Sequence, residues 1–177
     1  MIADHIECPF IELSMPCTDV TAMETFWSHY FGGEVIFRGR MLGQPFSRML
    51  VCGVTLVFRE DPDYAPPPGP GQEFMFRDHL GFRVRDLDES IAALEALGAQ
   101  FVLTPERVKA LQQMRDDDGD PFLQTDYAKA PLTTERLAQG EFKTRVAIMV
   151  GPDNIWVELN EIREPADARW FPAPHLG

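Results

Sequence analysis

The sequence has few basic residues and no long apolar segment. Its 16 Lys and Arg stand against 28 Asp and Glu, which gives a formal net charge of -12. Such an acidic surface repels phosphate groups, so we expect neither nucleic acid nor a membrane as a partner. No apolar run approaches the roughly 18–20 residues needed to span a bilayer. The N-terminus also lacks the basic and apolar regions of a secretory signal. These absences favour a cytoplasmic protein that acts on a small-molecule substrate.

Cysteine is scarce and shows no paired spacing. The three residues Cys8, Cys17 and Cys52 contain no CxxC pair. This pattern favours free, buried thiols in a reducing compartment over a disulfide or a zinc site. Hydrophobic residues make up 45% and charged residues 25% of the 177 residues. That composition is typical of a globular chain of one domain or two small halves.

Two segments of the chain follow the same plan at an offset of 67 residues. The offset aligns Asp19 with Asp86, and Glu12 with His79. Each segment begins with a predicted strand, at 11–17 and at 79–84, and the Asp that follows is typical of a helix N-cap. Apolar residues then recur at helical spacing until a glycine ends each predicted helix. We interpret this pattern as an internal duplication.

Further strands are predicted after each helix, at 34–40, 46–52 and 54–60, and then at 100–103, 143–150 and 155–161. The turns between the first three are expected at Gly43-Gln44-Pro45 and at Gly53. The order predicts an α+β fold of two tandem βαβββ modules, 9–60 and 78–162. A proline-rich linker at 61–77, which we expect to be stiff, joins them, and 163–177 form a C-terminal tail.

An insertion at 104–142 interrupts the second module. Its first part, 105–114, is predicted to be helical because Pro105 suits the first turn of a helix. Loops of this length often serve as functional lids, so Tyr127 and Lys129 are candidate lid residues. The run Asp116–Asp120 lacks the alternate-residue spacing of a calcium loop, and a solvated acidic turn is the better interpretation.

Three polar residues occupy strand positions where apolar ones are expected, namely Glu12, His79 and Glu158. If the two halves pair about a pseudo-twofold axis, the aligned Glu12 and His79 face each other, and Glu158 can join them. An imidazole and carboxylates that converge suit a divalent metal such as Zn, Mn, Co, Ni or Fe(II). Simpler roles stay open: a hydrogen bond from His79 to a loop carbonyl, and a solvent-facing position for either carboxylate. His5 is a competitor for the place of Glu12.

At three places the sequence resembles the vicinal oxygen chelate superfamily of glyoxalase, bleomycin-resistance and extradiol-dioxygenase proteins. PFIELSMPCTDV resembles the family's first strand and helix cap, DHLGFRVRDL the opening of its second module, and GPDNIWVEL its closing strand. The resemblance implies a curved mixed sheet around a central cleft and assembly as a homodimer. It also places Glu12, His79 and Glu158 at the metal-ligand positions of the first, fifth and eighth strands.

The sequence departs from the family pattern at two positions. Glu12 stands where the family usually has His, and the fourth-strand ligand of glyoxalase I falls near the apolar Leu56. The resemblance implies a metal-dependent lyase or isomerase of the glyoxalase type, in which Glu158 or Glu12 moves the proton. Two alternatives remain: an Fe(II) extradiol-type ring-cleaving dioxygenase, and a metal-free small-molecule binding or resistance protein.

Overall fold

The computed structural model describes residues 12–69, 78–117 and 144–162. It divides into two compact units. The first contains Met1–Phe74 together with Gly151–Ile155, and the second contains Met75–Val150 and Trp156–Gly177. The unit boundary therefore does not follow the order of the chain, because a short segment near residue 153 belongs with the first unit.

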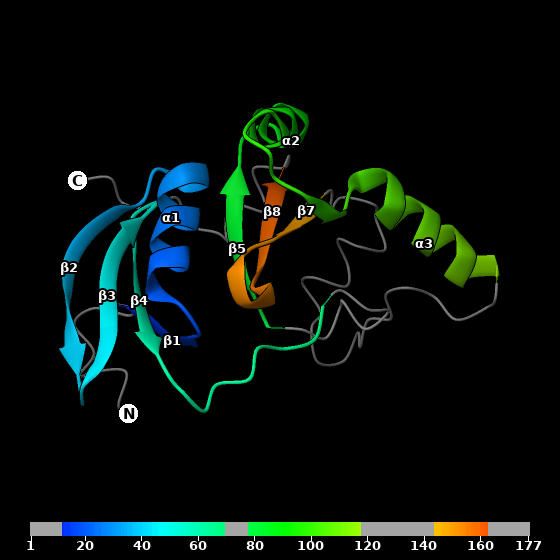
Figure 1. The fold of residues 1–177 in the computed structure, drawn as a ribbon. Coiled ribbons are helices and arrows are strands. Elements are labelled where there is room, and N and C mark those ends of the chain that lie inside the picture. The colour runs from blue at the N-terminus through cyan, green and yellow to red at the C-terminus, as the bar shows by residue number, and fades with distance from the viewer. Residues whose placement is uncertain (1–11, 70–77, 118–143, 163–177) are drawn as a thin grey trace, which may run out of the picture. The chain divides into compact units, whose positions relative to one another are not determined.

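The first module is a four-stranded mixed sheet with one helix (Figure 1). In chain order its elements are β1 (Leu13–Cys17), α1 (Val20–Phe31), β2 (Glu34–Met41), β3 (Gln44–Val51) and β4 (Val54–Glu60). The strand order across the sheet is β1-β4-β3-β2, with β1 parallel to β4 and the other pairs antiparallel. Strands β1 and β2 are thus the two edges of this sheet.

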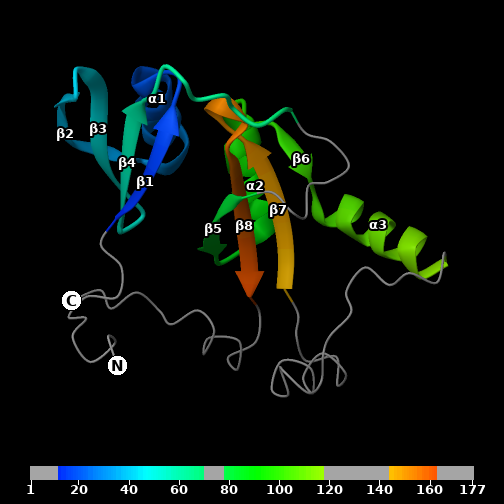
Figure 2. The same ribbon diagram turned by 90° about the horizontal axis from the view of Figure 1, so that it is seen from below.

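The second module repeats this order, with an extra helix (Figure 2). Its elements are β5 (His79–Val84), α2 (Leu87–Ala96), β6 (Phe101–Leu103), α3 (Pro105–Asp117), β7 (Thr144–Val150), the 3₁₀ turn η3 (Pro152–Asn154) and β8 (Trp156–Ile162). The order β5-β8-β7-β6, with β5 parallel to β8, matches the first sheet strand for strand. The predicted α+β fold of two βαβββ modules is confirmed.

In both modules the free N–H groups at the start of the helix are bonded by an equivalent pair of acidic residues. The N-cap Asp19 accepts hydrogen bonds from the backbone of Thr21 (2.7 Å) and Ala22 (3.1 Å), and Asp86 accepts one from Glu89 (2.9 Å). A glutamate at the end of the last strand accepts the next free N–H. Glu60 bonds to Val20 N (3.2 Å), and Glu161 bonds to Leu87 N (3.3 Å). The duplication therefore extends to how each helix start is satisfied.

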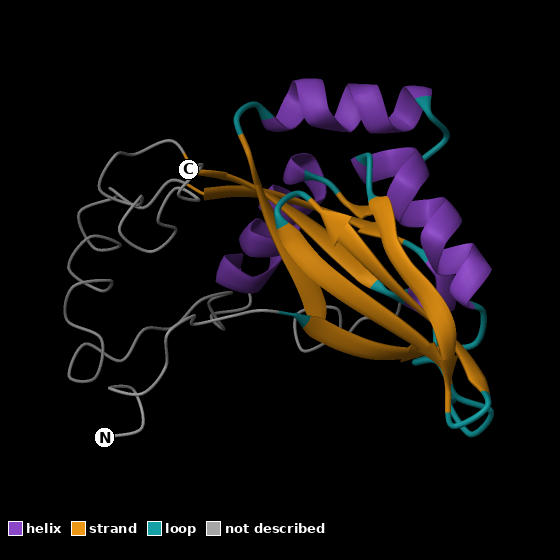
Figure 3. Cartoon of the chain, turned by 90° about the vertical axis from the view of Figure 1, so that its left-hand side faces the viewer, coloured by secondary structure: helices purple, strands orange, loops and turns teal. Residues whose placement is uncertain are grey.

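Helix α1, one of the helices drawn in purple in Figure 3, packs against strands β3 and β4 of the first sheet. Trp27 has no exposed surface and stacks on Phe58 of β4, with ring centroids 6.3 Å apart. Gly33 follows the helix at a close approach: a Cβ there would lie 3.0 Å from Val51 Cγ2 and 3.1 Å from Trp27 O. Only glycine fits there without a shift in its neighbours. None of the helices described is both long and apolar enough to cross a membrane.

The turns of the first sheet contain both predicted glycines, Gly43 and Gly53, but Gln44 and Pro45 belong to β3 and not to a turn. The two hairpins turn at Leu42-Gly43 and Cys52-Gly53, and all four residues have positive φ between 49° and 85°. Pro45 lies inside β3, at an end that has no partner in β4 and therefore needs no N–H. The prediction of buried thiols is correct for Cys17 and wrong for Cys52, which is exposed. Burial, followed by the charges of Asp153 and Glu60, raises the Cys17 pKa to about 12.

The turn between β7 and β8 packs within the first unit. Asp153 accepts hydrogen bonds from Thr18 N, at 2.7 Å, and from Thr18 Oγ1. Asn154 Nδ2 donates to Pro67 O at 2.9 Å. Asp153 and Asn154 are both left-handed (φ 54° and 56°), a conformation that their short polar side chains tolerate. The proline-rich linker is thus held at Pro67 by a side chain that is distant in sequence.

Candidate functional site

His79 and Glu158 meet on one face of the second sheet. Their strands β5 and β8 are parallel neighbours, and Glu158 lies opposite Gly81, two residues beyond His79. Because side chains alternate along a strand, His79, Gly81 and Glu158 share a face. His79 Nε2 lies 3.6 Å from Glu158 Oε2, and the two side chains are 38% and 21% exposed. The structure therefore brings together two of the three predicted site residues.

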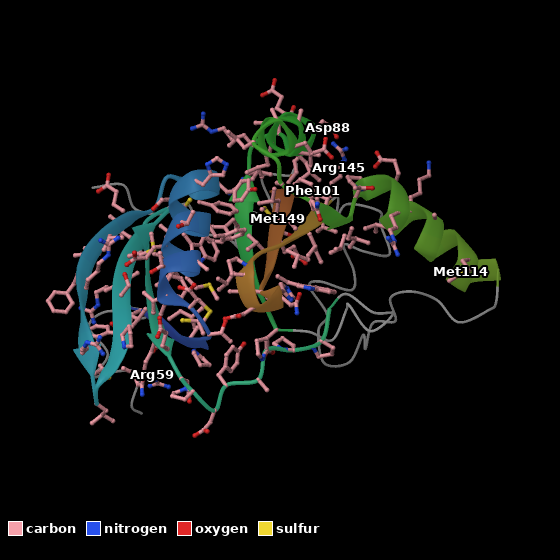
Figure 4. The ribbon with its side chains drawn as sticks, viewed as in Figure 1. Arg59, Asp88, Phe101, Met114, Arg145 and Met149 are labelled. Atoms are coloured by element: carbon pink, nitrogen blue, oxygen red, sulfur yellow. The ribbon has the colours of Figure 1, made fainter. Side chains whose placement is uncertain are left out.

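The other face of this sheet carries helix α2. Arg145 of β7 donates to Asp88 of α2 (2.6 Å) and to Glu161 of β8 (3.0 Å), and Figure 4 shows Asp88 and Arg145 side by side. The hydrogen bonding of the Arg145 guanidinium to the Asp88 carboxylate is the main cause of the raised Arg145 pKa. Glu161 is adjacent to Asn160 and three residues from Glu158, so its side chain points to the helix side. The charges on that face hold the helix in place, which leaves Glu158 and His79 to the opposite face.

The separation of the two donor atoms suits a shared metal ion. Two ligands at about 2.1 Å from a tetrahedral ion lie about 3.4 Å apart. The observed 3.6 Å is close to this value and longer than an ordinary hydrogen bond. One imidazole nitrogen and one carboxylate oxygen are also donors that Zn, Mn and Fe(II) accept. In the described ranges, no group of three His, Cys, Asp or Glu side chains is placed to hold a metal.

Glu12 belongs to the first unit, where its carboxylate is an ion-pair partner. Arg48 Nη2 of β3 donates to Glu12 Oε2, and the two side chains are 46% and 33% exposed. Arg48 is a residue that the sequence reasoning missed. A signal was present, because side chains alternate along a strand. Ser47 and Met49 of β3 face the apolar side of the sheet, so Arg48 between them must face the other side. Glu12 and the His79–Glu158 pair thus belong to different units.

The duplicated strand register shows which residue of the first sheet occupies the position equivalent to Glu158. Gly81 aligns with Ser14 at the 67-residue offset, and Ser14 lies opposite Val57 in β4. Val57 is therefore the counterpart of Glu158, one residue beyond Leu56, and it is buried. It has no metal-binding group, so the expectation that this position carries no ligand also holds in the observed register.

Several predicted residues lie outside the described part of the chain. These are His5 and the candidate lid residues Tyr127 and Lys129. Helix α3 continues to Asp117, three residues beyond the predicted end at Met114, and so takes in the first two residues of the acidic run. The remainder of that run also lies outside the described residues.

Residues 11–124 match the family described as the glyoxalase-like domain. The chain belongs to this family. The match begins at β1, spans the whole first module and continues through the strand that carries His79 and through helix α3. Together with the duplicated βαβββ order, it confirms the resemblance to the vicinal oxygen chelate superfamily. No curated protein matches the sequence.

Solved structures share the fold of this glyoxalase-like chain at low sequence identity. The fosfomycin resistance protein FosX from Listeria monocytogenes is 15% identical (TM-score 0.54), with 89% of this chain and 95% of FosX covered. FosX from Mesorhizobium loti is 11% identical (TM-score 0.54; 94% and 98% covered). A glyoxalase, bleomycin-resistance protein and dioxygenase domain from Frankia is 16% identical (TM-score 0.52; 89% and 98% covered). Other crystals of the Listeria protein contain Mn(II), one of them together with 1S,2S-dihydroxypropylphosphonic acid.

Proposed function

We propose that this glyoxalase-like chain is a metal-dependent lyase or isomerase that acts on a small metabolite with two adjacent oxygen atoms. The observation that carries the proposal is the His79–Glu158 pair, whose donor atoms lie 3.6 Å apart on the sheet face opposite α2. The Mn(II) bound to FosX of similar fold supports a divalent ion in such a site. A bound ion would supply Lewis-acid stabilisation of a developing negative charge on a substrate oxygen.

The chain's own residues then have separate tasks. His79 and Glu158 hold the ion from neighbouring strands, and the partly exposed side chains leave access for a substrate. Glu12, at the duplicate position of His79, is our candidate for the third ligand. Glu158 or Glu12 would take the proton from the carbon next to a substrate oxygen and return it to the product. Arg48 orients the Glu12 carboxylate through its ion pair.

Metal content tests this proposal directly. We expect about one Mn, Co, Ni, Zn or Fe(II) per chain after purification without chelator and loading with each metal in turn. His79→Ala and Glu158→Gln should each lose the ion, since each removes one of few ligands. Matched controls are His29→Ala and Glu95→Gln, which change an exposed His and an exposed Glu on helices. A wild-type protein that binds none of these metals would overturn the proposal.

Glu12 needs a second measurement, because a ligand and a base fail in different ways. If Glu12 is a ligand, Glu12→Gln lowers metal affinity by about 10- to 100-fold. If it is the base, the variant keeps its metal but loses turnover. Arg48→Met is the control, because it removes the ion-pair partner and leaves the carboxylate in place. Unchanged metal binding and turnover in Glu12→Gln would remove Glu12 from the site.

A further inference from the structure

A pocket in the first unit is lined only by residues of that unit. It has a volume of about 430 Å³ and opens between the first turns of α1 and the strands β2 and β3. Arg38 lies opposite Ser47, which lies opposite Phe58, the residue that stacks on Trp27 of α1. The pocket is therefore on the helix side of the first sheet, whereas Arg48 and Glu12 use the other side. Its volume is within the range of small-molecule sites.

One of the two arginines that line this pocket is already neutralised. Arg38 Nε donates to both carboxylate oxygens of Glu24 (2.8 and 3.0 Å), and its Nη2 donates to Oε2 at 2.6 Å. These hydrogen bonds are the main reason why the pKa of the buried Glu24 is lowered. Both groups are thus ionised and paired, and they add no net charge to the pocket.

Arg40 and Glu60 retain hydrogen-bonding capacity in the same pocket. Arg40 Nη1 donates to Gly43 O at 2.7 Å, and Nε and Nη2 have no partner among the described residues. Glu60 Oε1 accepts from Val20 N, and within the described chain its Oε2 has no partner. The pocket thus offers one cationic fork and one carboxylate oxygen, each of which lacks a counter-charge.

The second module shows that this open carboxylate is particular to the first. Glu161 is the counterpart of Glu60 and makes the same bond to its helix start, but Arg145 also donates to it at 3.0 Å. The matching pocket of the second module, about 320 Å³, is lined by Asp88, Glu95 and Glu106 and by no basic side chain. Of these two pockets, the one in the first module combines an arginine and a glutamate that both have unused hydrogen-bonding groups, and the one in the second module does not.

We propose that this pocket binds an amino acid, whose carboxylate is held by Arg40 and whose ammonium group is held by Glu60. An arginine fork matches a carboxylate with two parallel hydrogen bonds, and an ammonium group donates to a carboxylate oxygen. A ligand with one charge of each sign leaves the pocket neutral, whereas a simple anion or amine leaves one group uncompensated. Val20, Pro45 and Phe46 supply apolar walls for the side chain, so leucine or phenylalanine should bind best.

Ligands that differ by one charged group test the proposal on the wild-type, full-length protein. NMR titration would compare leucine with 4-methylpentanoate, which lacks the ammonium group, and with 3-methylbutylamine, which lacks the carboxylate. The phenylalanine series would be phenylalanine, 3-phenylpropanoate and phenethylamine. We expect shifts confined to α1 and the β2–β3 hairpin, and at least about tenfold weaker binding of each truncated ligand, as loss of one charge-assisted hydrogen bond predicts.

Variants then assign the two ends of the ligand. Arg40→Met should weaken amino-acid binding about tenfold or more, and Arg107→Met on α3 is the matched control. Glu60→Gln should remove the preference for the amino acid over the acid. Its control Glu161→Gln changes the same helix-start bond in the second module, so a loss through helix damage alone would be recognised by thermal unfolding. Absence of binding, equal binding of the truncated ligands, or shifts outside this pocket would overturn the proposal.

Discussion

The two modules have the same backbone plan but differ in how tightly their helices are packed. Helix α1 buries five side chains, including Met23, Phe26 and Trp27, whereas α2 buries two, Leu87 and Leu94. Both begin with the same Asp cap and the same glutamate from the last strand. The caps are therefore the shared element and the packing is the variable one. This difference indicates that a duplicated module keeps the groups that satisfy its backbone, while its faces diverge.

The polar faces show the same divergence. On the face opposite the helix, the first module has Arg48 where the second has Ile148, and Val57 where the second has Glu158. As a result, the first sheet carries the Arg48–Glu12 ion pair, and the second sheet carries the His79–Glu158 pair. Two of the three proposed metal ligands thus belong to the second sheet, and the third, Glu12, is paired with Arg48 in the first unit.

The largest expected effect concerns the packing difference. Trp27→Ala should lower the free energy of unfolding by about 4 kcal/mol, because it empties a fully buried aromatic site. Leu94 is its counterpart in α2, and Leu94→Ala should lower it by about 2–3 kcal/mol. Urea unfolding followed by far-UV circular dichroism measures both. Equal losses would contradict the view that α1 is the more tightly packed helix.

The Arg38–Glu24 pair has no equivalent on α2, because Ile91 replaces Glu24 at the duplicate position. Arg38→Ala should destabilise the protein, since it leaves a buried carboxylate without its partner. The loss should be smaller than for a fully buried pair and smaller than in Trp27→Ala, because the Arg38 side chain is 68% exposed. Arg40→Ala, two residues along the same strand, should change stability by less than about 0.5 kcal/mol.

This pair also predicts a pH dependence. The Glu24 pKa is lowered in the folded state from its ordinary value of 4.5, so the folded state favours the ionised carboxylate. The resulting stabilisation is fully present above pH 4.5 and is lost as the pH falls below 4.5 through the folded-state pKa. Urea unfolding between pH 3 and 7 should therefore show a smaller pH-dependent loss in Glu24→Gln than in wild type. Parallel curves would show that another carboxylate is responsible.

A smaller effect separates the two helix caps. Asp19 accepts two backbone hydrogen bonds and Asp86 accepts one, so Asp19→Ala should cost about 1–1.5 kcal/mol and Asp86→Ala about 0.5–1 kcal/mol. Asp19→Asn and Asp86→Asn are the controls, because asparagine caps helices nearly as well. Calorimetric unfolding of the four variants measures the difference. A larger loss for Asp86→Ala would reverse this ranking.

The smallest expected effect is a gain in stability at a hairpin. The first sheet turns at Leu42 and Cys52 in left-handed conformation, whereas the β7–β8 turn uses Asp153 and Asn154. Leu42 is 98% exposed, so its side chain gains nothing from packing. Leu42→Asn should stabilise the protein by about 0.5 kcal/mol, because Asn-Gly is preferred in such turns. Leu42→Val is the opposite control and should destabilise, since β-branched residues are strained at positive φ.

Most of the fold was predictable because it depends on local signals. Periodicity, the Asp caps and the helix-ending glycines placed the module strands and helices to within a few residues. The errors in the predicted elements occur where the conformation depends on pairing with a strand that is distant in the sequence. Pro45 was predicted to be in a turn, but the end of β3 extends past β4 and leaves that position free of a ladder bond.

Only part of the candidate site could be predicted from the sequence. The 67-residue repeat and the closing motif identified His79 and Glu158, because both lie at fixed places in a duplicated strand order. The pairing of Glu12 with Arg48 depends on two strands that are not adjacent in the sheet, so no spacing along the chain indicates it. Burial of Glu24 was missed for the same reason, since its partner Arg38 comes from a different element.

The turn at Gly151–Ile155 has a consequence for the order of events during protein synthesis. This segment completes the first unit, and a Cβ on Gly151 would lie 2.8 Å from the Phe26 ring, so the two are in close contact. A ribosome that has translated only the first 74 residues has therefore not yet made a part of the structure that covers α1. We expect the nascent first half to reach its final packing only after residue 155 has left the exit tunnel, although its own sheet is encoded far earlier.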